Sequence, residues 1–441
     1  MANQRPGTPP PRYSIASASS EALLQQPLAP TEHSASEQFR HSQGLQQDQI
    51  SDININNTGD DVDDDENTKS LHPQPRHRSR RRRTLLIRLL IASVIILALL
   101  LLLGIYKLVY NSRKRPEPPM PRKVMTNFPD PGLLEYNGTW YAFGTNPTSD
   151  DDGTKFHVPI ATAVGGGRDD DDGGFFGEWK HTGRDALPEL AMWETKRDHW
   201  APDVLTRADG RHLLYYSGEL DVWRRHYCIG VALSETADPL GPYKPEGTYL
   251  ACPSEHGGGI HPSAITDTDG TIYLVYKGDG NSMNRYPSGS DSSECTNAIR
   301  PLRSTPLLLQ QMKAGGLRAD GEAVQILDRV EKEDGPLVEA PSLIRSAQGV
   351  YFLFYSSHCS NSRAYDVKYA TAKEITGPYV KAGKPLLKTG DFGLLAPGGA
   401  SVSKDGGKIA FHADCGEEGK CMWVAGVEID GLEARIVPSP S

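Results

Sequence analysis

A pattern of alternating apolar and polar residues recurs five times between residues 130 and 414. Each copy contains a proline, a short apolar strand, a turn with glycine, and a second strand rich in Tyr, Phe, Leu and Val. The copies are DPGLLEYNGTWYAFGT, APDVLTRADGRHLLYYSG, HPSAITDTDGTIYLVYKG, APSLIRSAQGVYFLFYSS and APGGASVSKDGGKIAFHAD. Alternation with a period of two around a glycine turn predicts a β-hairpin in every copy.

The five hairpins begin at regularly placed prolines, which indicates an internal repeat. These are Pro131, Pro202, Pro262, Pro341 and Pro397, at spacings of roughly 56 to 79 residues. Segments ending in Gly-Pro-Tyr follow two of the hairpins and supply a third strand, and a fourth strand would follow each. Four-stranded sheets repeated radially are typical of a propeller, so residues 124–441 are predicted to form an all-β, five-bladed β-propeller.

Two other architectures fit this pattern less well. A helical solenoid is excluded because the segments lack a period of 3.6 residues. A β-sandwich would not repeat a whole hairpin five times. The propeller is therefore the predicted fold.

An uncharged apolar run from Leu89 to Tyr106 predicts one transmembrane helix, placed at residues 84–110. Residues 1–83 are polar and almost free of aromatic residues, so we expect a disordered tail. A dense arginine cluster, residues 76–83, precedes the apolar run and is a topology signal rather than a nucleic-acid site. We expect a signal anchor with a cytoplasmic tail, a linker at 111–123, and a propeller in the secretory lumen or outside the cell.

The cysteines support this topology. All six lie after the apolar run, as expected in an oxidising compartment: Cys228, Cys252, Cys295, Cys359, Cys415 and Cys421. Cys415 with Cys421 could staple a hairpin, and Cys228 with Cys252 could join neighbouring strands, although spacing alone does not fix connectivity. The sequon at Asn137 would be open to glycosylation on the same side of the membrane.

The prolines also indicate where to look for chemistry. The innermost strand of every blade lines the axis of a propeller, so residues beside the prolines should converge at one end. Asp130, Asp203, His261 and Glu339 occupy such positions. Acidic residues that meet on one axis repel each other and are costly to desolvate, which favours a functional role over a structural one.

Four motifs resemble glycoside hydrolase family 43, the five-bladed propeller enzymes that remove arabinose, xylose or galactose units from polysaccharides. The motifs are FPDPGLLEYNGTWYAFGT, HWAPDV, GPLVEAPSL followed by YFLFYSS, and ITGPY. The resemblance implies a general base at Asp130 and a general acid at Glu339. Phe128, Trp200 and Asp203 adjoin or belong to these motifs and are predicted to bind substrate.

The resemblance also implies a reaction and raises one question about it. In an inverting glycosidase one carboxylate activates a water molecule and one protonated carboxyl gives its proton to the leaving oxygen. The two groups lie about 6.5 to 9.5 Å apart. The family's third acidic residue, which raises the pKa of the general acid, is replaced by His261. Two readings stay open: a glycosidase with a shifted pH optimum, or a propeller that binds glycans or proteins and has lost catalysis.

We expect no cofactor and no metal. Many family members carry a divalent ion on a histidine of the last blade, here His412, but the neighbouring Pro-Gly-Gly-Ala offers no ligand side chain. The acidic runs at residues 150–152 and 169–172 lack EF-hand spacing and are expected to be solvated loops. The expected partners are a carbohydrate substrate and the membrane, without nucleic acid, and the protein is expected to be a monomer.

Overall fold

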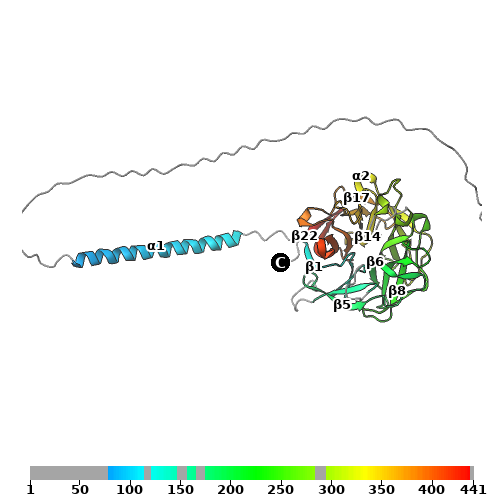
Figure 1. Ribbon diagram of the computed structural model, residues 1–441, viewed down its shortest axis with the longest axis horizontal. Coiled ribbons are helices and arrows are strands. Elements are labelled where there is room, and N and C mark those ends of the chain that lie inside the picture. The colour runs from blue at the N-terminus through cyan, green and yellow to red at the C-terminus, as the bar shows by residue number, and fades with distance from the viewer. Residues whose placement is uncertain (1–77, 114–120, 147–155, 165–173, 284–294, 438–441) are drawn as a thin grey trace, which may run out of the picture. The chain divides into compact units, whose positions relative to one another are not determined.

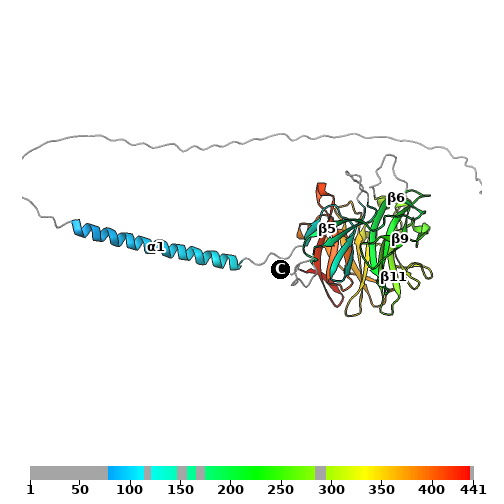
Figure 2. The same ribbon diagram turned by 90° about the horizontal axis from the view of Figure 1, so that it is seen from below.

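The computed structural model describes residues 78–113, 121–146, 156–164, 174–283 and 295–437. The described residues between 121 and 437 form five antiparallel sheets around one axis, and residues 78–113 form helix α1. Figure 1 shows the sheets following one another around a ring, and Figure 2 shows the same strands from the side. The prediction of an all-β, five-bladed propeller is therefore confirmed.

Each of the first three blades is a sheet of four strands in chain order. Blade one contains β2 (Gly132–Tyr136), β3 (Thr139–Phe143), β4 (Pro159–Ala163) and β5 (Trp179–Asp185). Blade two contains β6 (Glu194–Thr206), β7 (His212–Leu220), β8 (Tyr227–Ser234) and β9 (Tyr243–Pro245). Blade three contains β10 (Gly259–Thr266), β11 (Ile272–Gly278), β12 (Leu307–Gln311) and β13 (Val324–Leu327).

The last two blades each carry an extra strand. Blade four contains β14 (Val338–Arg345), β15 (Tyr351–Ser357), β16 (Asp366–Ala372), β17 (Val380–Lys381) and β18 (Leu387–Lys388). Blade five contains β19 (Gly398–Val402), β20 (Lys408–Asp414), β21 (Lys420–Asp430) and β22 (Glu433–Val437), together with β1 (Arg122–Met125). Because β1 pairs with β21, the first strand in the chain completes the last blade and closes the ring.

Short helices occur only in the loops of the described propeller residues. They are η1 (Ser254–His256), η2 (Asn281–Met283), η3 (Thr296–Ala298), α2 (Glu331–Asp334), η4 (Asp391–Gly393) and η5 (Gly416–Glu418). The hydrophobic core lies between the blades, where aromatic and aliphatic side chains of facing sheets pack together.

A set of side chain to backbone hydrogen bonds joins the innermost strands around the axis. Asp203 Oδ2 accepts the N–H of Ala264 at 2.6 Å, and three serines repeat this contact around the ring. The Oγ of Ser263 accepts the N–H of Leu343 at 3.3 Å, that of Ser342 accepts the N–H of Val402 at 3.0 Å, and that of Ser401 accepts the N–H of Leu133 at 3.1 Å. Gly132 takes the equivalent place in blade one, where a Cβ would lie 2.1 Å from the carbonyl oxygen of Pro202.

The fifth copy of the sequence repeat is displaced by three residues from its predicted register. Ala400, rather than Pro397, occupies the channel position held by a proline in the other four blades. Gly399 before it has the positive φ that the residue before proline has elsewhere. Glycine adopts this conformation without a steric cost, so the turn forms there without proline, and alignment on the proline alone was wrong.

Helix α1 (Arg78–Arg113) is described separately from the propeller. Its segment Arg82–Lys107, which holds an 18-residue window with a mean hydropathy of 3.0, is the one helix of the described chain that is long and apolar enough to cross a membrane. The helix begins within the expected tail and ends within the expected linker, because arginine is a good helix former. The rest of the expected tail and both acidic runs lie outside the described residues.

Three disulfides join the six cysteines. Cys228 pairs with Cys252 and Cys415 with Cys421, which confirms both expected pairs. The third links Cys295 to Cys359, from the loops of blades three and four. Asn137 is exposed in the turn between β2 and β3, so the sequon is accessible in the folded domain.

Candidate active site

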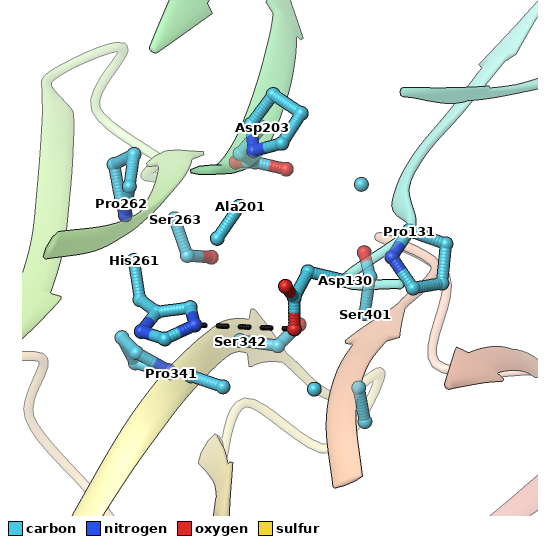
Figure 3. A pocket seen from close by; sticks show the side chains of 15 residues that line it. Asp130, Pro131, Ala201, Asp203, His261, Pro262, Ser263, Pro341, Ser342 and Ser401 are labelled. Carbon is cyan, nitrogen blue, oxygen red and sulfur yellow. Dashed lines mark ion pairs between the residues drawn. The ribbon is translucent and has the colours of Figure 1, made fainter. Parts of the chain in front are cut away.

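Five residues with positive φ lie on or just before the innermost strands, level with one another around the channel. They are Asp130 (49°), Ala201 (43°), His261 (55°), Ala340 (50°) and Gly399 (58°). A left-handed conformation is unusual for residues other than glycine and clusters at functional sites. Together with the two residues that follow each of them, these residues line a narrow central channel. Figure 3 shows Asp130 and His261 directed toward each other across this channel.

A wider pocket of about 920 Å³, including its open mouth, shares Asp130 and His261 with the channel. Glu339 of blade four lines the same pocket, as does Trp200 of blade two. The carboxyl groups predicted to be base and acid therefore share one cavity. The rest of its wall comes from Pro129, Thr145, Ile260, Asn281, Cys295, Leu337, Ser360, Asn361, Tyr365 and Lys420.

Asp130 is held by one hydroxyl and two histidines. Thr145 Oγ1 donates to its Oδ2 at 2.7 Å, and His261 Nε2 lies 3.9 Å from its Oδ1. His412 Nδ1 lies 3.2 Å from both the backbone nitrogen and Oδ1 of Asp130. A neutral ring with its proton on Nε2 accepts the backbone N–H, whereas a protonated Nδ1 donates to the carboxylate.

Burial alone would raise the pKa of Asp130, but His412, His261 and Lys420 outweigh it. The pKa of Asp130 therefore lies well below its usual range, and the group is a carboxylate at neutral pH. A carboxylate next to open space is the form that can accept a proton from water.

Glu339 is held by a cation. Lys277 Nζ lies 3.2 Å from Glu339 Oε2, with the lysine side chain fully buried and that of Glu339 9% exposed. Burial would raise the pKa of Glu339, but Lys277 and then His261 lower it below its usual range. The surroundings of Glu339 therefore favour its ionised form.

His261 departs from the family pattern, and its surroundings decide its charge. Burial is the main cause that lowers the pKa of His261, against the opposing effects of Glu339 and Asp130. The imidazole is accordingly neutral at neutral pH. The cation in contact with Glu339 is Lys277.

The three predicted substrate contacts lie in different places. Trp200 lines the pocket and stacks on Tyr227, with ring centroids 4.0 Å apart. Phe128 is buried beneath Gly144 and packs against His181. Asp203 lines the central channel and holds the N–H of Ala264. Neither Phe128 nor Asp203 is among the pocket-lining residues.

Sequence analysis missed several residues of the site: Thr145, Lys277, Tyr365 and Lys420. Thr145 makes the same contact to the next blade as Ser217, and the strand register places Lys277 level with Ser217. The aromatic residues of FGT and YKG instead align Lys277 with Gly144, so the sequence did not reveal this equivalence. Tyr365 precedes β16, outside any repeat position we compared.

The described residues offer no convincing metal centre. Two groups of three potential ligands occur, His226 with Cys228 and Cys252, and Cys415 with Glu418 and Cys421. Both contain the two cysteines of a disulfide, which have no thiolate to give to a metal.

A five-bladed propeller with acidic side chains of separate blades in one axial pocket has the architecture of carbohydrate-cleaving propellers. The chain belongs to glycosyl hydrolases family 43, whose model matches residues 176–423. Membership supports glycoside hydrolysis as its activity and carbohydrate as its substrate.

The curated relatives include two enzymes of Bacillus subtilis (strain 168). Extracellular endo-alpha-(1->5)-L-arabinanase 2 is 24% identical over 275 residues, 58% of this chain and 51% of the relative. Extracellular endo-alpha-(1->5)-L-arabinanase 1 is 25% identical over 271 residues, 59% of this chain and 70% of the relative. The chain thus spans about half the length of the first of these enzymes.

Solved structures share the fold. A thermostable family-43 glycoside hydrolase superposes with a TM-score of 0.55 at 21% identity, covering 72% of this chain and 96% of its own. An endo-1,4-beta-xylanase from Bacteroides thetaiotaomicron VPI-5482 gives a TM-score of 0.51 at 25% identity, covering 72% and 97%.

Proposed function

We propose that this protein hydrolyses α-L-arabinofuranosyl linkages in arabinan-type polysaccharides or oligosaccharides, with inversion, using Asp130 as general base and Glu339 as general acid. The observation that carries the proposal is the shared pocket, which receives one carboxyl from blade one and one from blade four. The named activity of the Bacillus subtilis relatives supports arabinan over xylan or galactan.

In the proposed reaction, Asp130 takes a proton from a water molecule while the oxygen of that water forms a bond to the anomeric carbon. Protonated Glu339 gives its proton to the glycosidic oxygen as the bond from that oxygen to the anomeric carbon breaks. Asp130 ends protonated and Glu339 ends ionised, and exchange with solvent restores both groups. Trp200, flat against Tyr227 in the pocket wall, offers a face on which the sugar ring stacks.

A second function is favoured by the ion pair of Glu339 with Lys277. A general acid must be protonated, and this pair stabilises the ionised form. The alternative is a glycan-binding propeller with impaired catalysis. In that case the pocket would bind arabino-oligosaccharides without cleaving them.

We further propose that α1 anchors the protein as a single-pass type II membrane protein, with its propeller on the lumenal or extracellular side. The span Arg82–Lys107 and three disulfides in the propeller support this placement.

The test is an assay of the full-length protein in detergent between pH 4 and 7. Its substrates are aryl α-L-arabinofuranoside, β-D-xyloside and β-D-galactoside, and linear arabinan. We expect cleavage of the arabinosides, with losses of roughly 10² to 10⁴-fold in Asp130→Asn and in Glu339→Gln. Proton NMR of the first product anomer checks inversion.

Two other outcomes decide against the proposal. Equal activity of Glu339→Gln and wild type would remove the acid assignment. Calorimetric binding of arabino-oligosaccharide without turnover at any pH would establish the glycan-binding alternative.

A further inference from the structure

Five equivalent side chains near the ends of the second strands face the next blade. Four of them hold the backbone N–H of the positive-φ residue of that blade. The contacts are Thr145 to Ala201 at 2.8 Å, Ser217 to His261 at 3.0 Å, Ser356 to Gly399 at 3.0 Å, and His412 to Asp130 at 3.2 Å. In each case the side chain supplies an acceptor.

Lys277 occupies the fifth position and breaks this pattern. The pairing of Lys277 with Ile260 matches that of Ser217 with Trp200 and of Ser356 with Glu339, so the three positions are equivalent. An ammonium group has three donors and no acceptor, so Lys277 cannot hold an N–H as the others do. It instead donates to Glu339 Oε2 at 3.2 Å.

The burial of Lys277 makes this contact more than a surface ion pair. Its side chain is fully buried, and an unpaired charge there would be strongly destabilising. Asp279, also fully buried, is close enough to interact with both Lys277 and Glu339, and burial raises its pKa to about 6. Lys277 thus lies near two buried carboxyl groups, those of Asp279 and Glu339, and only Glu339 lines the pocket.

We propose that Lys277 is a positioning residue that stabilises the carboxylate form of Glu339 and so confines proton donation by Glu339 to acidic solution. This inference rests on the proposed function and specifies its pH range. The charged and titratable groups around Glu339 come from several elements: Lys277 of β11, His261 of β10, Asp279 after β11, Tyr365 before β16, and His412 of β20.

The other neighbours do not offset the lysine. Burial lowers the pKa of His261 and of His412, so both rings are neutral at neutral pH, and burial raises the pKa of Tyr365 far above neutral pH. Asp279 opposes Lys277 only where it is ionised, above about pH 6. Where His261 is protonated it lowers the pKa of Glu339 in the same direction as Lys277, and Lys277 is the larger of the two influences.

The test compares wild type with Lys277→Met, which keeps the length of the side chain and removes its charge. Without the cation the buried Glu339 holds its proton to higher pH. We expect the alkaline limb of the kcat/KM profile to move up by about one pH unit, which raises the rate at pH 6 to 7 by up to about tenfold. KM should change little.

A second measurement does not depend on activity. Titration of the ¹³C-labelled Glu339 carboxyl in substrate-free protein, assigned with Glu339→Gln, should give a midpoint below 4.5 in wild type and above it in Lys277→Met. A wild-type midpoint above 4.5, or equal midpoints in both proteins, would overturn the inference. The titration of Glu339 in wild type still tests the inference if Lys277→Met does not fold.

Lys368→Met is the matched control, because Lys368 is also nearly buried and is paired with Asp334 outside the pocket. It should lower stability without moving the midpoint of Glu339. If wild type cleaves no glycoside but Glu339 titrates as expected, the proposed function fails and the role of Lys277 stands. If cleavage occurs but the profile of Lys277→Met matches that of wild type, the role of Lys277 fails alone.

Discussion

Asp130 and Glu339 line the same pocket from blades one and four, and their neighbours differ in kind. A hydroxyl and two buried histidines surround Asp130, with Lys420 near enough to lower its pKa, whereas Lys277 contacts Glu339 directly. The environment of Asp130 suits a base, which works as a carboxylate. That of Glu339 opposes the protonated form that an acid needs, so the pair predicts activity that declines as pH rises above the lowered pKa of Glu339.

The largest effect on this contrast should come from position 261, which faces both carboxyl groups. His261→Asp replaces a neutral ring with an anion, which raises the pKa of Glu339 and extends its protonated range upward. We expect the alkaline limb of kcat/KM to shift upward by about one unit, which raises the rate at pH 6 up to about tenfold. Rate profiles of purified wild type and variant between pH 4 and 8 measure the shift.

His261→Asn is the control for this prediction, because it changes the shape of the side chain without adding charge. The alkaline limb of its kcat/KM profile should coincide with that of wild type. If the profiles of His261→Asp and His261→Asn coincide, the charge at position 261 does not govern the proton of Glu339.

The sequence predicted the ring and the meeting of its carboxyl groups, because each hairpin carries its own strand pattern. Asp130, His261 and Glu339 gather at one end of the axis since neighbouring hairpins close in register. The displacement at Pro397 could not be foreseen from proline spacing, because a glycine forms the same turn. The pocket also depends on long-range packing, which buries Phe128 and turns Asp203 to the next blade.

Lys277 shows a different reason for incomplete prediction. It is the penultimate residue of β11, whose pattern is otherwise ordinary, and only its register against Ser217 and Ser356 marks it as unusual. The role proposed for Lys277 depends on its contact with Glu339, which is 62 residues away in sequence. A single chain read along its length does not reveal such a pair.

A smaller effect should follow from removing the neutral donor to Asp130. Thr145→Val keeps the shape of the side chain but loses the hydrogen bond to Asp130 Oδ2 and the acceptor for the N–H of Ala201. We expect kcat to fall several-fold to about tenfold with little change in KM, because a typical hydrogen bond contributes about 0.5 to 1.5 kcal/mol. Steady-state kinetics at the pH optimum measure it.

Thr145→Ser restores the hydroxyl and should recover most of the rate. Equal losses in the valine and serine variants would mean that packing of the methyl group, rather than the hydroxyl, holds Asp130. A fall in thermal midpoint shared by both variants would point the same way.

The smallest effect on catalysis is expected at Asp203, the acidic residue beside a repeat proline that the pocket does not reach. Its Oδ2 holds the N–H of Ala264 in the next blade, so Asp203→Ala leaves a buried donor without its partner at a cost of about 1 to 3 kcal/mol. The thermal midpoint should fall by roughly 2 to 4 °C per kcal/mol, with KM unchanged. Asp203→Asn keeps an acceptor and should stay close to wild type in both measurements. If KM for arabino-oligosaccharides instead rises in both variants while the midpoint holds, Asp203 contacts substrate as its motif first indicated, and the contrast between pocket and channel carboxyl groups is lost.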